Sequence, residues 1–220
     1  MKREIAKNII KLSGKYTTYT VFTDWVKIVA LSIANSSTLV HDKIWRQREE
    51  QYLQVINKYS KEEQSILADM MGKLIIAFEH ETYDILGEIY MEAECGNKST
   101  GQFFTPYHVS ELCAGMLLEN KIKKDKGQIT INEPSCGGGG MIIAYLNLLK
   151  KQGINYQENV KVVAQDIDWN SVYMCYTQLS LLGVKAIVCQ GDTLTDPNIR
   201  EYPKERIFET IMSKLNFCKY

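Results

Sequence analysis

The sequence predicts an α/β protein in which a helical domain over residues 1–95 precedes a domain over residues 96–220 with about four β-strands. Three observations predict this class. Apolar residues recur at helical spacing through the first part, and short strand-like runs alternate with helical patterns through the second. Four consecutive glycines, at 137–140, stand between a strand pattern and a helix pattern. Such alternation is typical of a parallel sheet with helices on its faces.

The first 95 residues indicate a series of helices. Ser60 and Glu63 have the spacing of a capping box, in which each side chain satisfies a backbone N–H of the other residue. Asp24 is expected to cap an earlier helix that contains Trp25. A polar, glycine-containing segment at 95–101 is the expected boundary between the two domains. The helix after the capping box has an apolar stripe made of Leu67, Met70, Met71, Leu74, Ile75 and Phe78.

Composition limits the classes of function. The 26 basic and 26 acidic residues cancel, so any contact with DNA is expected to be local or shared with a partner. The six cysteines form no CxxC pair and the three histidines are scattered, which predicts reduced thiols and no metal site. No apolar run has membrane-spanning length and the start lacks a secretion signal, so we expect a cytoplasmic protein without a membrane partner.

Acidic residues follow three of the strands expected in the second domain. Glu133, Asp166 and Asp192 each stand where a strand pattern ends. Since parallel sheets bind ligands at the carboxyl ends of their strands, these acids are candidate ligand-binding residues. The strands are expected at 129–133, 160–165, 186–190 and 207–212, and the helices between them at 140–151 and 170–182.

The glycine loop and the acids together indicate a nucleotide-like ligand. No Lys follows the glycines, so the loop is not a P-loop, and it is not a clean GxGxxG motif. Asp166 comes directly after its strand and is the candidate acceptor for ribose hydroxyls, whereas Asp168 suits a helix cap. Asp192 either accepts a hydrogen bond from an exocyclic amine or stabilises a turn. An oxidoreductase that uses a dinucleotide would share these features.

A pair of aromatic residues, Phe103 and Phe104, precedes the next helix. Thr105 is expected to cap that helix and Pro106 to occupy its first position. The capping role leaves the two aromatics unexplained, and they either pack in the core or line a pocket. The expected buried stripe of this helix consists of Val109, Leu112, Cys113, Met116 and Leu117.

Four segments, at 101–106, 133–140, 164–168 and 191–194, resemble in order the motifs of a known family. They read GQFFTP, EPSCGGGG, AQDID and GDTL, and they are similar to motifs of the adenine-N6 DNA methyltransferases of type I restriction-modification systems, in particular the modification subunits. The resemblance implies a helical domain followed by a truncated Rossmann-like sheet that uses S-adenosylmethionine. A dinucleotide oxidoreductase would not explain the first and last of these segments.

The resemblance also implies a role for each motif. Phe104, Thr105 and Pro106 would lie along the methionine end of S-adenosylmethionine, and the loop 133–139 would pass beneath the methionine and ribose. Asp166 would hold the ribose hydroxyls, and Asp192 the adenine amine. The cofactor-binding residues implied in this way are Phe103, Phe104, Thr105, Pro106, Glu133, Pro134, Ser135, Cys136, Gly137, Gly139, Asp166, Ile167, Asp192 and Thr193.

The chain departs from the family pattern after the fourth strand. The family carries Asn or Asp, two prolines and an aromatic there, whereas Lys214 takes the catalytic position and only Phe217, at the base-stacking position, remains. A lysine cannot accept a hydrogen bond from an adenine amine. We therefore expect a shortened methyltransferase that binds S-adenosylmethionine but is catalytically incompetent alone. The alternative is a non-catalytic S-adenosylmethionine-binding module that regulates or assists a partner.

The resemblance extends to partners. It implies DNA as the substrate, bound with help from a specificity subunit or a second methylase subunit. Because the fourth strand would lie at an exposed sheet edge, we expect that edge to be covered by a second copy of the chain, by a partner or by the helical domain.

Overall fold

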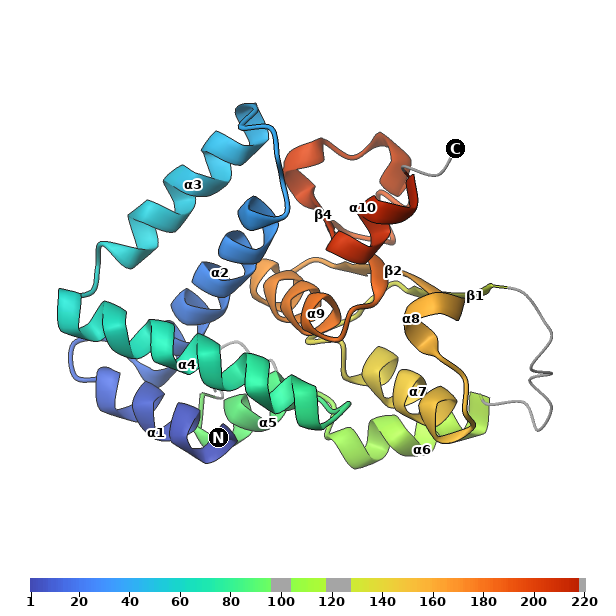
Figure 1. Cartoon of the computed structure of the whole chain (residues 1–220), viewed down its shortest axis with the longest axis horizontal. Helices are drawn as coiled ribbons and strands as arrows, with labels where there is room; N and C mark the ends of the chain where they lie inside the picture. Colours follow the sequence, from blue (N-terminus) through green and yellow to red (C-terminus); the bar gives the residue numbers. More distant parts are fainter. Residues whose placement is uncertain (96–103, 118–127, 218–220) are drawn as a thin grey trace. The chain divides into compact units, whose positions relative to one another are not determined.

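The computed structural model describes residues 1–95, 104–117 and 128–217 (Figure 1). The chain divides into two compact units: Met1–Glu81 with Ile85–Phe103, and Thr82–Asp84 with Phe104–Tyr220. The first unit is helical and the second contains the sheet. The short segment Thr82–Asp84 belongs to the second unit, although the helices before and after it in the chain belong to the first. The predicted domain boundary after residue 95 stays a prediction.

The first unit is built around aromatic and aliphatic side chains from several helices. The buried Trp25 indole donates a hydrogen bond to the carbonyl of Leu67 at 3.2 Å, and the ring of Phe22 meets that of Tyr90 edge-on at 5.3 Å. The predicted capping box is confirmed, with Ser60 and Glu63 each bonded to the other's backbone N–H. The helices are α1 (Lys2–Leu12), α2 (Thr18–Ser36), α3 (Lys43–Ile56), α4 (Lys61–His80) and α5 (Ile85–Glu92).

The expectation that Asp24 caps a helix is wrong. Helix α2 begins at Thr18, and its cap is Thr17, whose hydroxyl accepts the N–H of Thr20. Asp24 lies inside the helix and is buried, with both carboxylate oxygens 3.1 Å from Nζ of Lys58 and one 3.1 Å from the hydroxyl of Tyr59. Burial and the charge of Asp24 raise the pKa of the Tyr59 hydroxyl. Long-range partners therefore explain this acid better than its local sequence.

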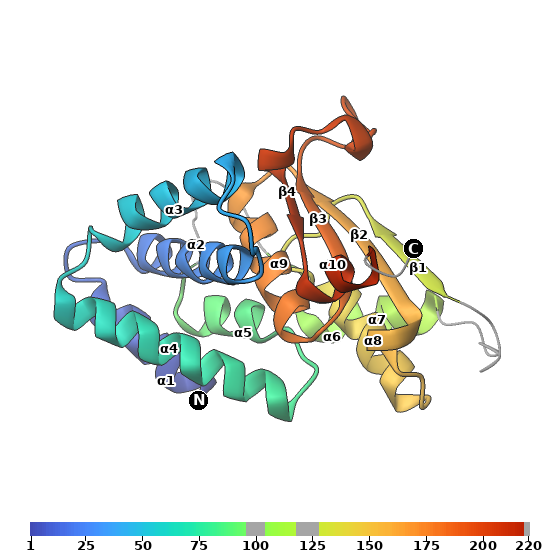
Figure 2. The ribbon, with the colours of Figure 1, turned by 45° about the horizontal axis from the view of Figure 1, so that its top comes forward.

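The second unit contains a four-stranded sheet in the order β1, β2, β3, β4 (Figure 2). The first three strands are parallel, and β1 pairs only with β2 among the described residues. The elements are α6 (Tyr107–Leu117), β1 (Ile129–Glu133), α7 (Gly140–Lys151), α8 (Tyr156–Asn159), β2 (Val160–Asp166), α9 (Trp169–Leu181), β3 (Lys185–Gln190), 3₁₀ turns at Ile199–Glu201 and Lys204–Arg206, β4 (Ile207–Glu209) and α10 (Ile211–Phe217).

The fourth strand differs from the prediction in direction and length. It runs antiparallel to β3 and ends at Glu209, whereas the sequence pattern predicted a parallel strand to residue 212. At Thr210 the side chain takes part in the pairing with β3, since its hydroxyl accepts the N–H of Ala186 at 3.0 Å and donates to Val184 O at 2.6 Å. Helix α10 follows at once. Strand β4 therefore ends beside the first residues of β3.

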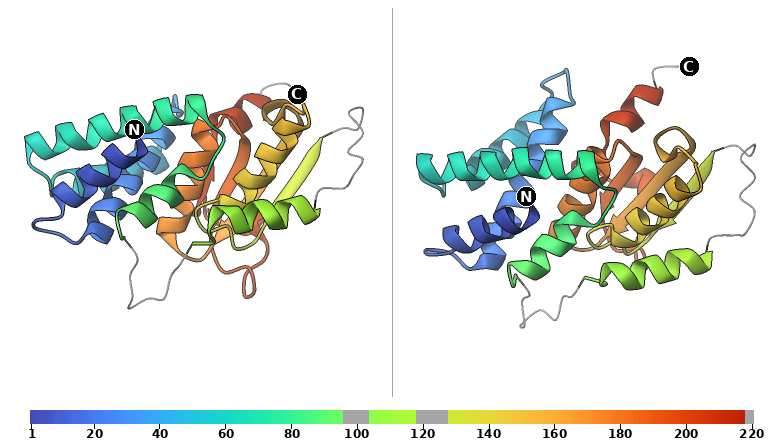
Figure 3. Two further views of the ribbon diagram at one scale, coloured as in Figure 1. Left: turned by 90° about the horizontal axis from the view of Figure 1, so that it is seen from below. Right: turned by 60° about the horizontal axis from the view of Figure 1, so that its bottom comes forward.

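Helix α6 also differs from the prediction. It lies beside α7 (Figure 3), but Leu112, Met116 and Leu117 are 66%, 80% and 69% exposed. Its buried positions are Tyr107, Ser110 and Ala114, since the face toward α7 carries small and polar residues that the apolar count overlooked. A groove of about 270 Å³ is lined by residues of α6, β1 and α7. No helix within the described ranges is long and apolar enough to cross a bilayer.

Candidate cofactor site

The glycine loop between β1 and α7 requires glycine for its backbone shape. Gly137 has φ of 52° and Gly139 has φ of 93°, both in the left-handed region. The N–H of Cys136 donates to Gln165 O at 2.9 Å, which joins the loop to the end of β2. The loop therefore turns the chain from β1 into α7 while it stays attached to the neighbouring strand.

Asp166 holds the glycine loop from the end of β2. Its Oδ2 accepts the N–H of Gly137 at 2.8 Å, and its Oδ1 accepts the N–H of Asp168 at 2.9 Å. Asp168 caps α9 through the N–H of Ser171, as the sequence predicted. Asp166 therefore fixes the glycine loop, and Asp168 caps α9.

The segment after β3 comes to the same place. The hydroxyl of Thr193 donates to Pro134 O at 2.8 Å, and the N–H of Gly191 donates to Asp166 O at 2.9 Å. Oδ1 of Asp192 accepts the N–H of Leu194 at 2.9 Å, and this backbone hydrogen bond, with help from the Thr195 hydroxyl, lowers the pKa of Asp192. The segments that follow β1, β2 and β3 therefore lie together in one cluster, which includes the carboxylates of Asp166 and Asp192.

Three of the remaining predicted residues also lie in this cluster. Oε1 of Glu133 accepts the N–H of Ser135 at 3.3 Å, and both residues stand where β1 enters the loop. Ile167, directly after β2, is 65% exposed. An exposed apolar side chain between two acids offers a surface for a flat ring.

The aromatic segment before α6 reaches the glycine loop. Cδ1 of Phe104 lies 3.4 Å from the point where a Cβ on Gly137 would stand, so the ring lies directly against the loop. Thr105 and Pro106 are exposed. Helix α6 begins at Tyr107, so Pro106 precedes the helix and does not occupy its first position as predicted, and its carbonyl accepts the N–H groups of Val109 and Ser110. Phe103 lies outside the described residues.

The thiol of Cys136 is buried beneath the loop. It forms a hydrogen bond with Cys175 of α9, and this bond and burial hold the pKa of Cys136 well above its usual value. A protonated, buried thiol is a poor nucleophile. We therefore assign Cys136 a packing role in the loop rather than a chemical one.

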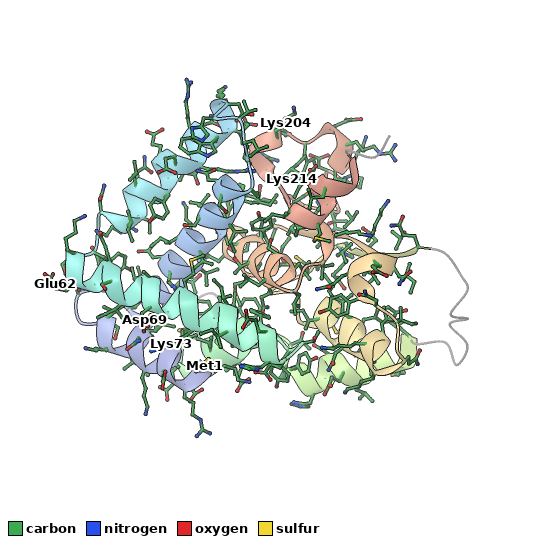
Figure 4. The ribbon with its side chains drawn as sticks, in the orientation of Figure 1. Met1, Glu62, Asp69, Lys73, Lys204 and Lys214 are labelled. Carbon is green, nitrogen blue, oxygen red and sulfur yellow. The ribbon has the colours of Figure 1, made fainter. Side chains whose placement is uncertain are left out.

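The structure does not bring Lys214 to this cluster. Lys214 lies on α10 (Figure 4), and α10 starts at the end of the sheet where β3 begins, which is opposite to the end where β3 meets Gly191. The six residues of β3 separate that end of the sheet from Gly191, a span of about 20 Å at roughly 3.3 Å per residue. The side chain of Phe217 lies outside the described residues. The match of these two residues to the catalytic motif is therefore one of sequence register only.

Sequence reasoning missed three residues that support the cluster. The ring and hydroxyl of Tyr202 fill the space that a side chain at Gly191 would need, and the hydroxyl accepts Nε2 of Gln165 at 2.6 Å. Gln178 and Asp84 lie behind the glycine loop and are almost fully buried. No local pattern in the sequence marks them, because the two partners lie 94 residues apart in the chain.

Parallel strands whose carboxyl ends carry a glycine loop and acids have the arrangement of a Rossmann-like fold. A crystal structure at 2.20 Å of a putative class I S-adenosylmethionine-dependent methyltransferase from Listeria monocytogenes has the same fold. It is 15% identical, with a TM-score of 0.50 over 87% of this chain and 54% of that chain. The N-6 DNA methylase family model matches residues 81–220, and the chain belongs to this family. The resemblance predicted from the four motifs is confirmed.

Two curated relatives are methylase subunits of type I restriction enzymes. The MjaIX subunit of Methanocaldococcus jannaschii is 26% identical over 137 residues, covering 60% of this chain and 23% of the relative. The MpnII subunit of Mycoplasma pneumoniae is 26% identical over 148 residues, covering 62% of this chain and 26% of the relative. The chain thus matches about a quarter of the length of each.

Proposed function

We propose that the chain binds S-adenosylmethionine along the carboxyl ends of β1, β2 and β3, as the cofactor-binding part of an adenine-N6 DNA methyltransferase of the type I restriction-modification kind. Membership of the N-6 DNA methylase family and the names of the two relatives support the reaction class. The observation that carries the cofactor assignment is the 2.8 Å hydrogen bond from Gly137 to Asp166. It sets an acid of β2 against the glycine loop of β1.

Asp166 and Asp192 can still accept hydrogen bonds from a ligand. A carboxylate oxygen has two lone pairs, and each oxygen of Asp166 uses one for a backbone N–H, so ribose hydroxyls donate to the others. The ionised Asp192 accepts the adenine amine, and Ile167 packs on the adenine ring. Phe104, with Thr105 and Pro106, lies along the methionine end.

A buried acid favours S-adenosylmethionine over a dinucleotide. Oδ2 of Asp84 lies 2.9 Å from the point where a Cβ on Gly140 would stand, at the N-terminus of α7. Dinucleotide enzymes place the pyrophosphate at this helix end, where a second negative charge would be repelled. S-adenosylmethionine has no phosphate and carries a sulfonium cation, which suits a cluster of carboxylates.

We expect no methyl transfer by this chain alone. Lys214 offers only donors, so it cannot hold an adenine amine, and it lies at the other edge of the sheet. The same observation favours the second candidate function, a non-catalytic S-adenosylmethionine-binding module that assists a partner. In both cases the proposed partners are DNA and a specificity or second methylase subunit. The balanced charge of the chain supports shared contact with DNA.

Calorimetric titration of the purified chain with S-adenosylmethionine and, separately, with NAD tests the cofactor assignment. We expect micromolar binding of S-adenosylmethionine and none of NAD. Binding of NAD alone, or of neither ligand by the folded chain, would refute it. Transfer of a labelled methyl group to unmethylated DNA is measured in parallel. Incorporation by the chain alone would contradict the second part of the proposal, and incorporation only with added subunits would separate the enzyme from the non-catalytic module.

A further inference from the structure

One buried amide connects the glycine loop to a distant part of the chain. Gln178 of α9 is fully buried, and its Nε2 donates to Gly138 O at 2.7 Å and to Asp84 Oδ1 at 2.7 Å. A glutamine amide nitrogen has two N–H groups, so both are used. The loop carbonyl is thereby joined to a carboxylate that lies 94 residues from Gln178 in sequence.

Asp84 is itself fixed by the segment that contains it. Thr82 accepts Nζ of Lys150 at 3.2 Å, and the ring of Tyr83 lies 4.0 Å from that of Tyr107. Asp84 is only 5% exposed. The N-terminus of α7 lies beside it, and its unpaired N–H groups and positive dipole end favour a negative charge. The acid is thus held in place from its own segment and stabilised by the helix.

We propose that Gln178 and Asp84 are positioning residues that hold Gly138 and Gly140 in the shape that binds the cofactor, an inference that rests on the proposed function. The loop has four glycines and so few side chains of its own to restrict its backbone. Asp166 fixes Gly137 from one side, and Gln178 fixes Gly138 from the other. A loop ordered before the ligand arrives does not lose that conformational entropy on binding.

The Gln178→Glu variant tests this role. It replaces the shared donor by an oxygen that faces two acceptors, the carbonyl of Gly138 and the carboxylate of Asp84. We expect at least a tenfold loss of affinity for S-adenosylmethionine and faster amide exchange in the peptide 134–146 without ligand. Gln157→Glu is the matched control, because the Gln157 Nε2 also donates to a backbone carbonyl, that of Leu182 at 2.9 Å, away from the loop. It should leave both measurements unchanged.

The double variant Asp84→Asn with Gln178→Glu separates positioning from general stability. It restores a hydrogen bond between the two side chains, but an oxygen at position 178 still faces the carbonyl of Gly138. We expect the melting temperature to recover relative to Gln178→Glu, while loop exchange stays fast and affinity stays low. Recovery of all three would mean that the pair only stabilises the fold and would overturn the proposal. If Gln178→Glu does not fold, Gln178→Met removes the donor with little change in volume and gives the same two measurements.

Failure of the proposed function can be told apart from failure of this inference. If the wild-type chain does not bind S-adenosylmethionine, the proposed function is wrong. The amide-exchange measurement then tests the positioning role of Gln178 by itself. Faster exchange of 134–146 in Gln178→Glu and not in Gln157→Glu supports the positioning role. Unchanged exchange overturns it, whether or not the ligand binds.

Discussion

Replacement of Asp166 by alanine should weaken cofactor binding and also lower the stability of the fold. The change removes the acceptor for the N–H groups of Gly137 and Asp168, at 2.8 and 2.9 Å. Both bonds are partly exposed, so water replaces the acceptor, and we expect a loss of about 1–3 kcal/mol in the free energy of unfolding. The ribose hydroxyls lose charge-assisted hydrogen bonds worth about 2–4 kcal/mol together, which lowers affinity about 30- to 700-fold.

Calorimetric titration of S-adenosylmethionine and urea unfolding, each on Asp166→Ala and wild type, measure the two effects. Glu205→Ala is the matched control, since Glu205 is an exposed acid of the segment between β3 and β4. It should change neither quantity. An affinity for S-adenosylmethionine within threefold of wild type in Asp166→Ala would show that this acid does not hold the ribose and would refute the assignment.

Further predictions concern two glycines, one helix cap and one buried thiol. Gly140→Ala should cost about 1–3 kcal/mol of stability in urea unfolding, because its Cβ would stand 2.9 Å from a carboxylate oxygen. Gly72→Ala, with nothing within 4 Å inside α4, should instead stabilise by about 0.5–1 kcal/mol, and equal effects would contradict the packing argument. Ser60→Ala should cost about 0.5–2 kcal/mol through loss of the capping box, measured in the same way, and no loss would show that the cap is dispensable. Because the pKa of Cys136 is raised, iodoacetamide at pH 8 should label it much more slowly than the half-exposed Cys113, and equal rates would show that the loop opens readily.

Local rules predicted the elements that depend on local chemistry. The capping box at Ser60, the Asp168 cap and the strand, glycine loop and helix from Ile129 onward all depend on residues within a few positions of one another. The direction of β4 does not, because it depends on where Thr210 finds carbonyl acceptors, and these lie at Val184 and Ala186. Alternation of strands and helices predicts parallel pairing only while a helix joins each strand to the next. Between β3 and β4 there are only short 3₁₀ turns.

The residues of the candidate site likewise fall into those that the local sequence predicts and those that it does not. The acids at the strand ends could be found from sequence because the position after a parallel strand is itself the signal. Gln178 and Asp84 could not, since their partnership joins residues far apart in the chain and gives no periodic pattern. The predicted buried face of α6 is wrong for a related reason. Apolar spacing locates a stripe, but Ser110 and Ala114 form the buried face because the neighbouring helix leaves room for small side chains.

The charges around the cluster separate cofactor binding from contact with DNA. Glu133, Asp166 and Asp192 stand at the ends of three adjacent strands, and Asp84 adds a buried carboxylate behind the loop. Carboxylates so placed favour a sulfonium cation and repel phosphate. The phosphates of DNA are therefore expected to approach along another surface, supplied by a partner or by a different part of the family's longer chains. The proposed function therefore assigns S-adenosylmethionine binding to this chain, and it assigns the groups that hold the adenine to another part of the proposed complex.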